Sequence, residues 1–490
     1  MTASDATTLT PYDEVPYLSG ARNASSIDRL ATLGSLLGIP VASPGGCRVL
    51  ELACGDGGNL LPMAVSFPGS EFVGVDLAPT AVARGMAGIA STGLENVRLL
   101  EGTFASAGPE LGQFDYVIAH GVYSWVPEAA RDELLRVIRE RLTPYGVAFV
   151  SYNAQPGSHI RGILREMMLM HTRAITEPVS KVKQARALLT LLAHAPAEAG
   201  DVYRPLLLSE VGKAMQTSDF MLFHDDLAEI NEPFFFSDFV AAAGRHGLQF
   251  AAEANFYQMS LEILEPEVAA QLAGLGQQDL IAKEQYLDFM TCRSFRQTLL
   301  CHQEVSLDRA VDMERVRLFR FSSAARRVEP AGEGGAIEFR CPNSSVLRTD
   351  NPATIAALEA MVACYPRSLS FESLADAAGV GSEDDADSLA EVLYRAFSAG
   401  VIEFRVSEPS VVFEVSERPL ASPWARHRSA TGHVVNLYHE TIGLDQTASA
   451  VLALLDGTST VSAIAAGLEM DEALVHTEVA GFAAKGLLVG

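Results

Sequence analysis

The feature that most constrains this chain is an alternation of apolar runs with helical segments along its N-terminal half. The apolar runs have the length and the β-branched and aromatic content of buried strands, and they lie at 47–54, 71–77, 96–104, 114–122 and 146–153. Segments at 59–67, 79–92 and 128–142 have helical patterns. Strands that alternate with helices at this pace form parallel sheets through βαβ units. The sequence therefore predicts an α/β domain over residues 46–257, with a sixth strand at 248–256.

The remaining segments are arranged around this domain. Residues 1–45 are polar and rich in Pro and Gly, so we interpret them as an arm that would form a lid. Residues 158–232 are mostly helical, and we expect an insertion there over the ligand crevice at the carboxyl ends of the strands. A less regular middle domain is expected at 258–345. Segments 346–410 and 411–490 each have helices followed by a short strand, the layout of a winged helix.

The net charge of −25 restricts the choice of partners. A strongly negative surface repels phosphate backbones, so we expect no nucleic-acid substrate. The helices that would read DNA in the two winged-helix modules are themselves acidic. The charge favours cationic partners, such as a protein or peptide with lysine residues. The cysteines form no CxxC pair and no His cluster has metal spacing, so we also expect no metal site.

The N-terminal segment and the lengths of the apolar runs bear on the cellular location of the protein. The N-terminal residues have neither a basic region nor an apolar region of the kind found in signal peptides. No apolar run approaches the roughly 18 residues that a membrane span needs. We therefore expect a cytoplasmic protein without a membrane span.

A Gly-rich loop carries the strongest chemical signal. The segment ELACGDGGN at 51–59 follows the first strand and opens a helix, and its glycines allow a close approach to a ligand. Asp76 ends the second strand, where an acid accepts hydrogen bonds from ribose hydroxyls. Dinucleotide-binding proteins share this acid, but the carboxylate of Glu51 would repel a pyrophosphate. It suits a cationic cofactor, and S-adenosylmethionine has both an ammonium and a sulfonium. The alternatives are that the loop binds NAD or FAD, or that it is a Gly-rich turn without a ligand.

These motifs also resemble those of a known family. ELACGDGGN and the following VDL are similar to motif I and the acidic motif of class I methyltransferases. Three further segments resemble a group of bacterial methyltransferases that have a methyltransferase regulatory domain. These segments are YDEVPY at 12–17, HGVYSWVP at 120–127 and SYNAQPG at 151–157. The group includes rickettsial protein lysine methyltransferases. Segments 222–248 and 295–302 are similar to the regulatory domain itself, and both C-terminal modules are similar to winged-helix ends of this family. The last module also resembles small peptide-binding domains of the PqqD kind. Ser158 departs from the family, where an aromatic residue is expected.

The resemblance implies a set of cofactor-binding residues. Glu51, Ala53, Gly55, Gly57 and Asn59 would form the loop at the methionine end of S-adenosylmethionine. The remaining positions would hold the ribose, the adenine and the methyl end, and they are Asp76, Leu77, Gly102, Thr103, Phe104, His120 and Gly121. Thr103 replaces an acid that is common in this class, so backbone groups would have to form the hydrogen bond with the adenine amine.

The methyl acceptor would lie against aromatic and polar side chains at the strand ends and in the arm. The candidates are Tyr12, Tyr17, His120, Tyr123, Trp125, Tyr152, Asn153 and His224. A lysine amine, with a free pKa of about 10.4, must lose a proton before attack, and an aromatic pocket would lower that pKa by desolvation. Each of these residues also has a structural interpretation. Tyr123 and Trp125 could equally pack in the core, and His120 could bond a backbone carbonyl. His224 is typical of the start of a helix.

We therefore predict an S-adenosylmethionine-dependent methyltransferase that methylates an amine of a protein or peptide, with lysine favoured. The first alternative is a small-molecule methyltransferase whose extra domains serve to form a homodimer. A second alternative is a regulator that binds the cofactor without catalysis. Extra domains of this size favour the protein or peptide substrate, because a small acceptor needs none of them.

Overall fold

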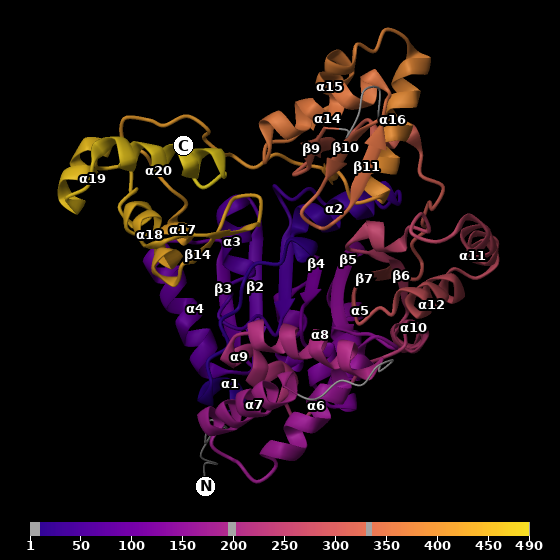
Figure 1. The fold of residues 1–490 in the computed structure, drawn as a ribbon, viewed down its shortest axis with the longest axis vertical. Helices are drawn as coiled ribbons and strands as arrows, with labels where there is room; N and C mark the ends of the chain where they lie inside the picture. Colours follow the sequence, from indigo (N-terminus) through magenta and orange to yellow (C-terminus); the bar gives the residue numbers. More distant parts are fainter. Residues whose placement is uncertain (1–9, 195–201, 330–335, 490) are drawn as a thin grey trace.

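The computed structural model describes residues 10–194, 202–329 and 336–489, and its centre is a seven-stranded sheet (Figure 1). The strand order is β3-β2-β1-β4-β5-β7-β6. The strands are β1 (Arg48–Leu52), β2 (Glu71–Asp76), β3 (Val97–Glu101), β4 (Phe114–Ala119), β5 (Leu142–Asn153), β6 (Leu248–Glu253) and β7 (Phe295–His302). Strands β1 to β5 pair in parallel, as predicted, whereas β7 is antiparallel to both β5 and β6. The sheet is therefore mixed rather than uniformly parallel.

Helices cover both faces of the sheet, which explains the continuous apolar runs in the strands. One face packs in a core with α2 (Ile27–Leu36) and α3 (Leu60–Ser66), and the other packs in a core with α5 (Glu128–Arg141) and α10 (Phe236–Arg245). Successive residues of a strand point to opposite faces, so Val49 lies in the first core and Leu50 in the second. The helices α1 (Pro11–Glu14) and α4 (Pro79–Thr92) lie in contact beside the sheet.

Strand β7 corrects the predicted domain boundary at residue 257. It follows α11 (Pro266–Gln278) and α12 (Leu280–Thr291), yet it returns to the sheet between β5 and β6. The buried Arg296 of β7 binds Glu253 of β6 at 2.7 Å and Asp288 of α12 at 2.8 Å. Its guanidinium also lies 3.8 Å from the centre of the Phe236 ring in α10. These contacts join residues on both sides of position 257 in one core, so α12 and β7 pack with the α/β domain.

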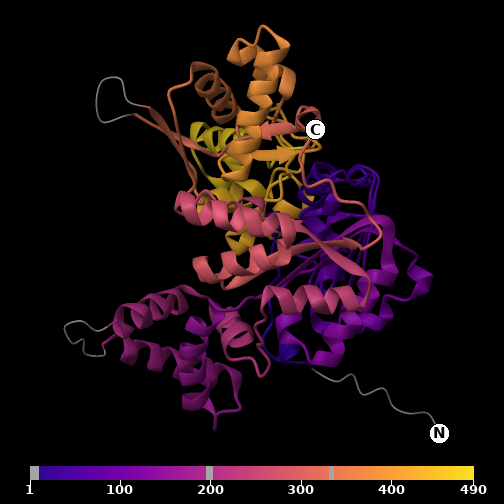
Figure 2. The ribbon, with the colours of Figure 1, turned by 90° about the vertical axis from the view of Figure 1, so that its right-hand side faces the viewer.

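The helical insertion predicted over 158–232 is present, and it has its own apolar core. Its helices are α6 (Ser158–Thr172), α7 (Pro178–Ala193), α8 (Tyr203–Gln216) and α9 (Asp219–Met221), followed by the π-helical turn η5 (Leu222–Asp226). Leu164, Met168 and Leu189 are among the residues of that core. The helices form a bundle at the opposite end of the molecule from the C-terminal modules (Figures 1 and 2).

The first C-terminal module combines helices with a sheet whose central strand precedes the predicted boundary at 346. The strands β12 (Leu369–Ser370), β8 (Arg320–Ser322) and β13 (Glu403–Arg405) pair in that order. The helices are α14 (Pro352–Cys364), α15 (Phe371–Ala378) and α16 (Glu383–Ser398), and a short α13 (Met313–Val316) precedes the module. A second small sheet consists of β9 (Arg326–Val328), β10 (Ile337–Arg340) and β11 (Val346–Thr349). Non-local pairing with β8 therefore places the start of this module near residue 320.

The second C-terminal module has a core of its own and lies against α3 and α4 (Figure 1). It consists of α17 (Pro423–Arg428), β14 (His433–Val435), β15 (Thr441–Gly443), α18 (Gln446–Ala453), α19 (Val461–Leu468) and α20 (Glu472–Ala484). Across the described parts of the chain, no helix has both the length and the apolar character needed to cross a lipid bilayer.

Candidate functional site

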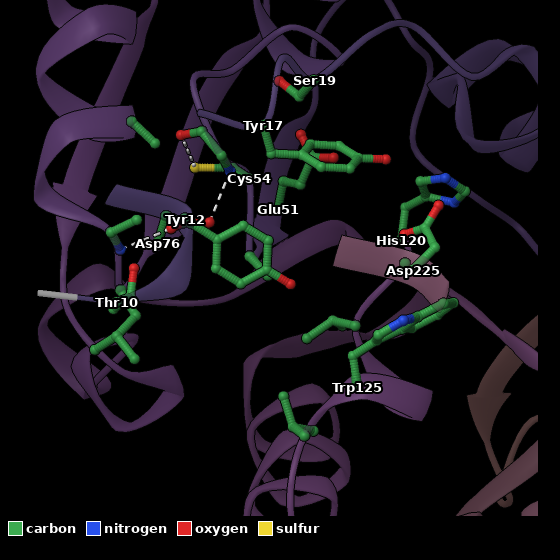
Figure 3. Close-up of a pocket in the computed structure, with 18 of the residues that line it drawn as sticks. Thr10, Tyr12, Tyr17, Ser19, Glu51, Cys54, Asp76, His120, Trp125 and Asp225 are labelled. Carbon is green, nitrogen blue, oxygen red and sulfur yellow. Dashed lines mark hydrogen bonds between the residues drawn. The ribbon is translucent and has the colours of Figure 1, made fainter. Parts of the chain in front are cut away.

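A cavity of about 960 Å³ lies at the carboxyl ends of the central strands (Figure 3). Its wall combines the N-terminal arm, the ends of β1, β2, β4 and β5, the helical bundle and the start of β7. This is the edge at which parallel α/β sheets bind ligands, because the loops that follow neighbouring strands meet there. The cavity is large enough to hold a nucleotide-sized ligand together with part of a second molecule.

The Gly-rich loop is bent tightly against the end of β2. Ala53, Gly55 and Gly57 all have positive φ values, of 60°, 57° and 76°. Such a conformation favours glycine, so Ala53 is a strained position within the loop. The carboxylate of Asp76 accepts the N–H of Gly55 at 2.7 Å and that of Ala78 at 2.8 Å. The loop and the acid are thus fixed relative to one another at the cavity wall.

Glu51 is a buried acid with one free oxygen. Its side chain is 3% exposed, and Asn59 Nδ2 donates to its Oε1 at 2.8 Å. Oε2 is also buried and has no partner within the described part of the chain. Burial raises the pKa of Glu51 to about 8. A buried acceptor without a donor is costly, so this oxygen is suited to a cationic ligand group.

The other residues predicted for the cofactor lie in the cavity wall, with one exception. The wall includes Glu51, Ala53, Gly55, Asn59, Asp76, Leu77, Gly102, Thr103, Phe104, His120 and Gly121. Gly57 lies behind the wall, where a Cβ atom would meet Leu61 at 2.3 Å. Its contribution is therefore the shape of the loop and not a direct contact with the cavity.

His120 lies at the end of β4 and is uncharged. Burial lowers its pKa to about 3. Its Nδ1 lies 3.0 Å from Ser151 Oγ in β5, and the same oxygen accepts the N–H of Gly121 at 2.8 Å. The imidazole is thus fixed by a neighbouring strand, rather than by the backbone carbonyl that the sequence suggested as an alternative.

The N-terminal arm lies over the cavity and is attached to the helical bundle. The ring of Tyr12 stacks on His224 at 4.4 Å between centroids, and Tyr17 contacts the same imidazole edge-on at 5.6 Å. His224 Nε2 is 2.6 Å from the carbonyl oxygen of Val15. Tyr12, Tyr17 and Trp125 face the same open space in Figure 3. The predicted residues of the arm are therefore brought together with the strand ends.

Tyr123 and Tyr152 do not line the cavity, so their predicted place beside the acceptor is corrected. Tyr152 stacks on Phe239 at 4.1 Å, and Tyr123 meets the same ring edge-on at 5.1 Å. Neighbouring residues of a strand point in opposite directions, so Asn153 lines the cavity while Tyr152 points into the core. Trp125, which lies in the same short turn as Tyr123, reaches the cavity instead.

Asp225 is a cavity residue that directly follows His224, for which the sequence indicated a helix start as the alternative. The π-helical turn Leu222–Asp226 directs three successive polar side chains to different places. His224 binds the arm, and Asp226 forms two hydrogen bonds with Arg161 at 2.7 and 2.6 Å. Asp225 lines the cavity, and its half-buried carboxylate has no hydrogen bond or ion pair among the described residues. Burial and the nearby Asp226 raise its pKa to about 7.

Three protein families match successive parts of the chain. A methyltransferase domain matches residues 49–146, and a predicted methyltransferase regulatory domain matches residues 218–302. The C-terminal winged-helix domain of the family abbreviated PKMT matches residues 417–479. The regulatory match spans the end of the bundle, α10, β6 and β7, which agrees with the single core formed across residue 257.

Similar proteins come from Rickettsia. The structure of PKMT2 from Rickettsia typhi in complex with AdoHcy has a TM-score of 0.87, is 26% identical, and covers 97% of this chain and 100% of that chain. Protein RP028 of Rickettsia prowazekii is 33% identical over 232 residues, which are 47% of this chain and 93% of that protein. Protein RP789 of the same organism is 36% identical over 309 residues, and the match spans 63% of this chain but only 56% of the length of RP789.

Proposed function

We propose that this chain, which belongs to the S-adenosylmethionine-dependent methyltransferases with a methyltransferase regulatory domain, methylates an amine of a protein or peptide, with lysine as the acceptor residue. The methyltransferase family match and the AdoHcy-bound relative support the cofactor and the class of reaction. The observation that carries the choice of acceptor is the Asp225 carboxylate, which lies among aromatic rings and has no hydrogen bond or ion pair within the described residues.

The residues of the cavity fit S-adenosylmethionine. We assign the free Oε2 of Glu51 to the ammonium of the cofactor, because this oxygen is buried and lacks a donor. We assign Asp76 to the ribose hydroxyls, because it ends β2 beside the Gly-rich loop. Gly102, Thr103 and Phe104 follow β3 and would lie along the adenine.

The acceptor part of the cavity suits a cation. The rings of Tyr12, Tyr17 and Trp125 and the carboxylate of Asp225 surround a common space (Figure 3). Aromatic faces attract ammonium groups, and an unpaired carboxylate does so more strongly. With a neutral or anionic acceptor, only the more distant positive charges of Arg22 and Arg161 in the cavity wall would act on the Asp225 carboxylate. The net charge of −25 adds a long-range attraction for basic polypeptides.

The reaction requires the acceptor amine to be aligned and neutral. The bound cofactor supplies a methyl group on a sulfonium, and the new N–C bond forms as the C–S bond breaks. Asp225 would hold the lysine ammonium as it arrives, and the aromatic wall would lower the pKa of that amine by removing water. Asp225 would then accept the proton, which its pKa of about 7 allows near neutral pH.

The experiment is mass spectrometry of a lysate from a strain that lacks this gene, after incubation with the purified protein and a methyl-labelled cofactor. Label on lysine of a discrete polypeptide, absent with Asp76→Ala, is the expected result. Label only in small molecules would overturn the proposal and favour a small-molecule methyltransferase. Label on another residue type would keep the protein substrate and exclude lysine.

A further inference from the structure

The second winged-helix module contacts the Gly-rich loop at two points. His439, in the loop after β14, places its Nε2 2.9 Å from Asn59 Oδ1. Arg428, at the end of α17, lies 3.9 Å from a carboxylate oxygen of Asp56. These residues are more than 360 positions from the loop in sequence, yet both reach the segment that forms the cofactor side of the cavity. The module thus contacts the site itself and not only the helices around it.

The loop that carries His439 is tightly constrained. Asn436 Oδ1 accepts the N–H groups of Tyr438 at 3.0 Å and Glu440 at 2.8 Å. Leu437 N–H donates to the carbonyl of Gly486, and Ser66 Oγ of α3 donates to the carbonyl of Leu437, both at 3.1 Å. His439 has a positive φ of 64°, which is strained for a residue with a side chain. Such strain persists where the surrounding contacts impose it, so the position of this imidazole is imposed by the module.

The hydrogen bonds define the form of His439. Burial lowers its pKa to about 3, so the ring is neutral and has one N–H. Asn59 Oδ1 accepts the backbone N–H of Arg22 at 3.0 Å, and a backbone N–H can only donate, so this atom of Asn59 is the oxygen. His439 Nε2 must therefore carry the proton and donate it to Asn59. The other amide atom, Nδ2, donates to Glu51 Oε1 at 2.8 Å.

We propose that His439 is a positioning residue of the cofactor site, and that the second winged-helix module is thereby a working part of that site. His439 fixes the amide of Asn59, and Asn59 fixes the carboxylate of Glu51 at the cavity wall. Cofactor binding and the seating of the module are then linked, and linkage acts in both directions. A partner that moves the module weakens cofactor binding, and bound cofactor tightens the module. This inference rests on the use of S-adenosylmethionine and is independent of lysine as acceptor.

The first test measures the affinity of the full-length protein for AdoHcy by calorimetry. His439→Ala is expected to weaken binding about tenfold, equivalent to about 1.4 kcal/mol. His439→Gln, which retains an N–H donor, is expected to recover part of this loss. In turnover assays the KM for S-adenosylmethionine should rise while kcat stays unchanged, because His439 does not line the cavity.

His427→Ala is a control variant in the same interface. The exposed His427 binds Ser91 of α4 at 2.8 Å and has no hydrogen bond or ion pair with the Gly-rich loop among the described residues. Its AdoHcy affinity should equal that of the unaltered protein. Equal affinity of His439→Ala and the unaltered protein would overturn the proposal. An equal loss in both variants would also overturn it, since the effect would then come from the interface in general.

Hydrogen exchange of the unaltered protein provides a second test that no folding defect can obscure. Amides of residues 436–440 should exchange more slowly when AdoHcy is added, as should those of the Gly-rich loop. Protection of the Gly-rich loop without any change at 436–440 would show that cofactor and module are not linked, and would contradict the proposal.

Discussion

The two halves of the cavity are built in different ways. The cofactor half consists of short segments that directly follow β1 to β4, and its polar groups are mostly paired, as Asp76 is with two backbone N–H groups. The acceptor half combines the N-terminal arm, the π-helical turn and the bundle. Its Asp225 carboxylate has no hydrogen bond or ion pair with any residue that the structure describes. The sheet places the segments of the first half, and the second winged-helix module contacts Asn59 there through His439. The second half is formed by segments that lie far apart in the chain, so acceptor specificity can change there without loss of the cofactor.

The largest expected effect comes from a substitution that alters only the acceptor half. Asp225→Asn should lower kcat on a lysine peptide on the order of a hundredfold, because the proton acceptor is lost. AdoHcy affinity should stay the same. Since burial raises the pKa of Asp225 to about 7, the activity of the unaltered protein should rise with pH through about 7, and the variant should lose this step. An unchanged pH–rate profile in Asp225→Asn would contradict the assignment.

A somewhat smaller effect is expected in the cofactor half. Glu51→Gln should weaken AdoHcy binding about thirtyfold, in the range of one hydrogen bond to a charged group. In the unaltered protein Glu51 is protonated below a pH of about 8, and binding an ammonium requires its ionised form, so a proton is released. Affinity should therefore rise as pH increases towards 8 and then level off. Calorimetry at several pH values checks this, and Glu51→Gln should show a much flatter dependence.

The contribution of the arm is expected to be smaller still. Tyr12→Ala removes the ring that stacks on His224 and faces the acceptor space, so the KM for the peptide should rise about fivefold. Tyr12→Phe retains the ring and serves as the control. Steady-state kinetics with the peptide varied would detect the change, and an equal effect in both variants would show that the hydroxyl matters and the ring does not.

No effect is expected from a residue that only packs. Tyr123 lies between Tyr152, Phe234 and Phe239 and does not line the cavity. Tyr123→Phe should leave kcat/KM within about twofold, as a change outside the site that keeps the ring and nearly its volume. A loss of activity at unchanged melting temperature would return Tyr123 to the acceptor site.

Much of the fold was predictable because strand and helix signals are local. The apolar runs mark β1 to β6, and the Gly-rich loop lies where the pattern requires it, between β1 and α3. The direction and place of β7 were not predictable, because its pairing depends on contacts such as Arg296 with Glu253, which the sequence pattern does not indicate. The boundary at 346 failed for the same reason, since β8 pairs with β12 and β13 from far along the chain.

The residues of the site also fall into those that local sequence predicts and those that it does not. The sequence by itself determined the acid and glycine pattern of the cofactor half, because a strand, a tight loop and a helix place neighbouring residues at one edge of the sheet. Only the tertiary structure decided that Asn153 faces the cavity and Tyr152 the core, that a π-helical turn directs Asp225 inward, and that His439 reaches Asn59. The physical reason is that side-chain direction and long-range contact depend on the packing of whole elements, and the local pattern of residues does not contain that information.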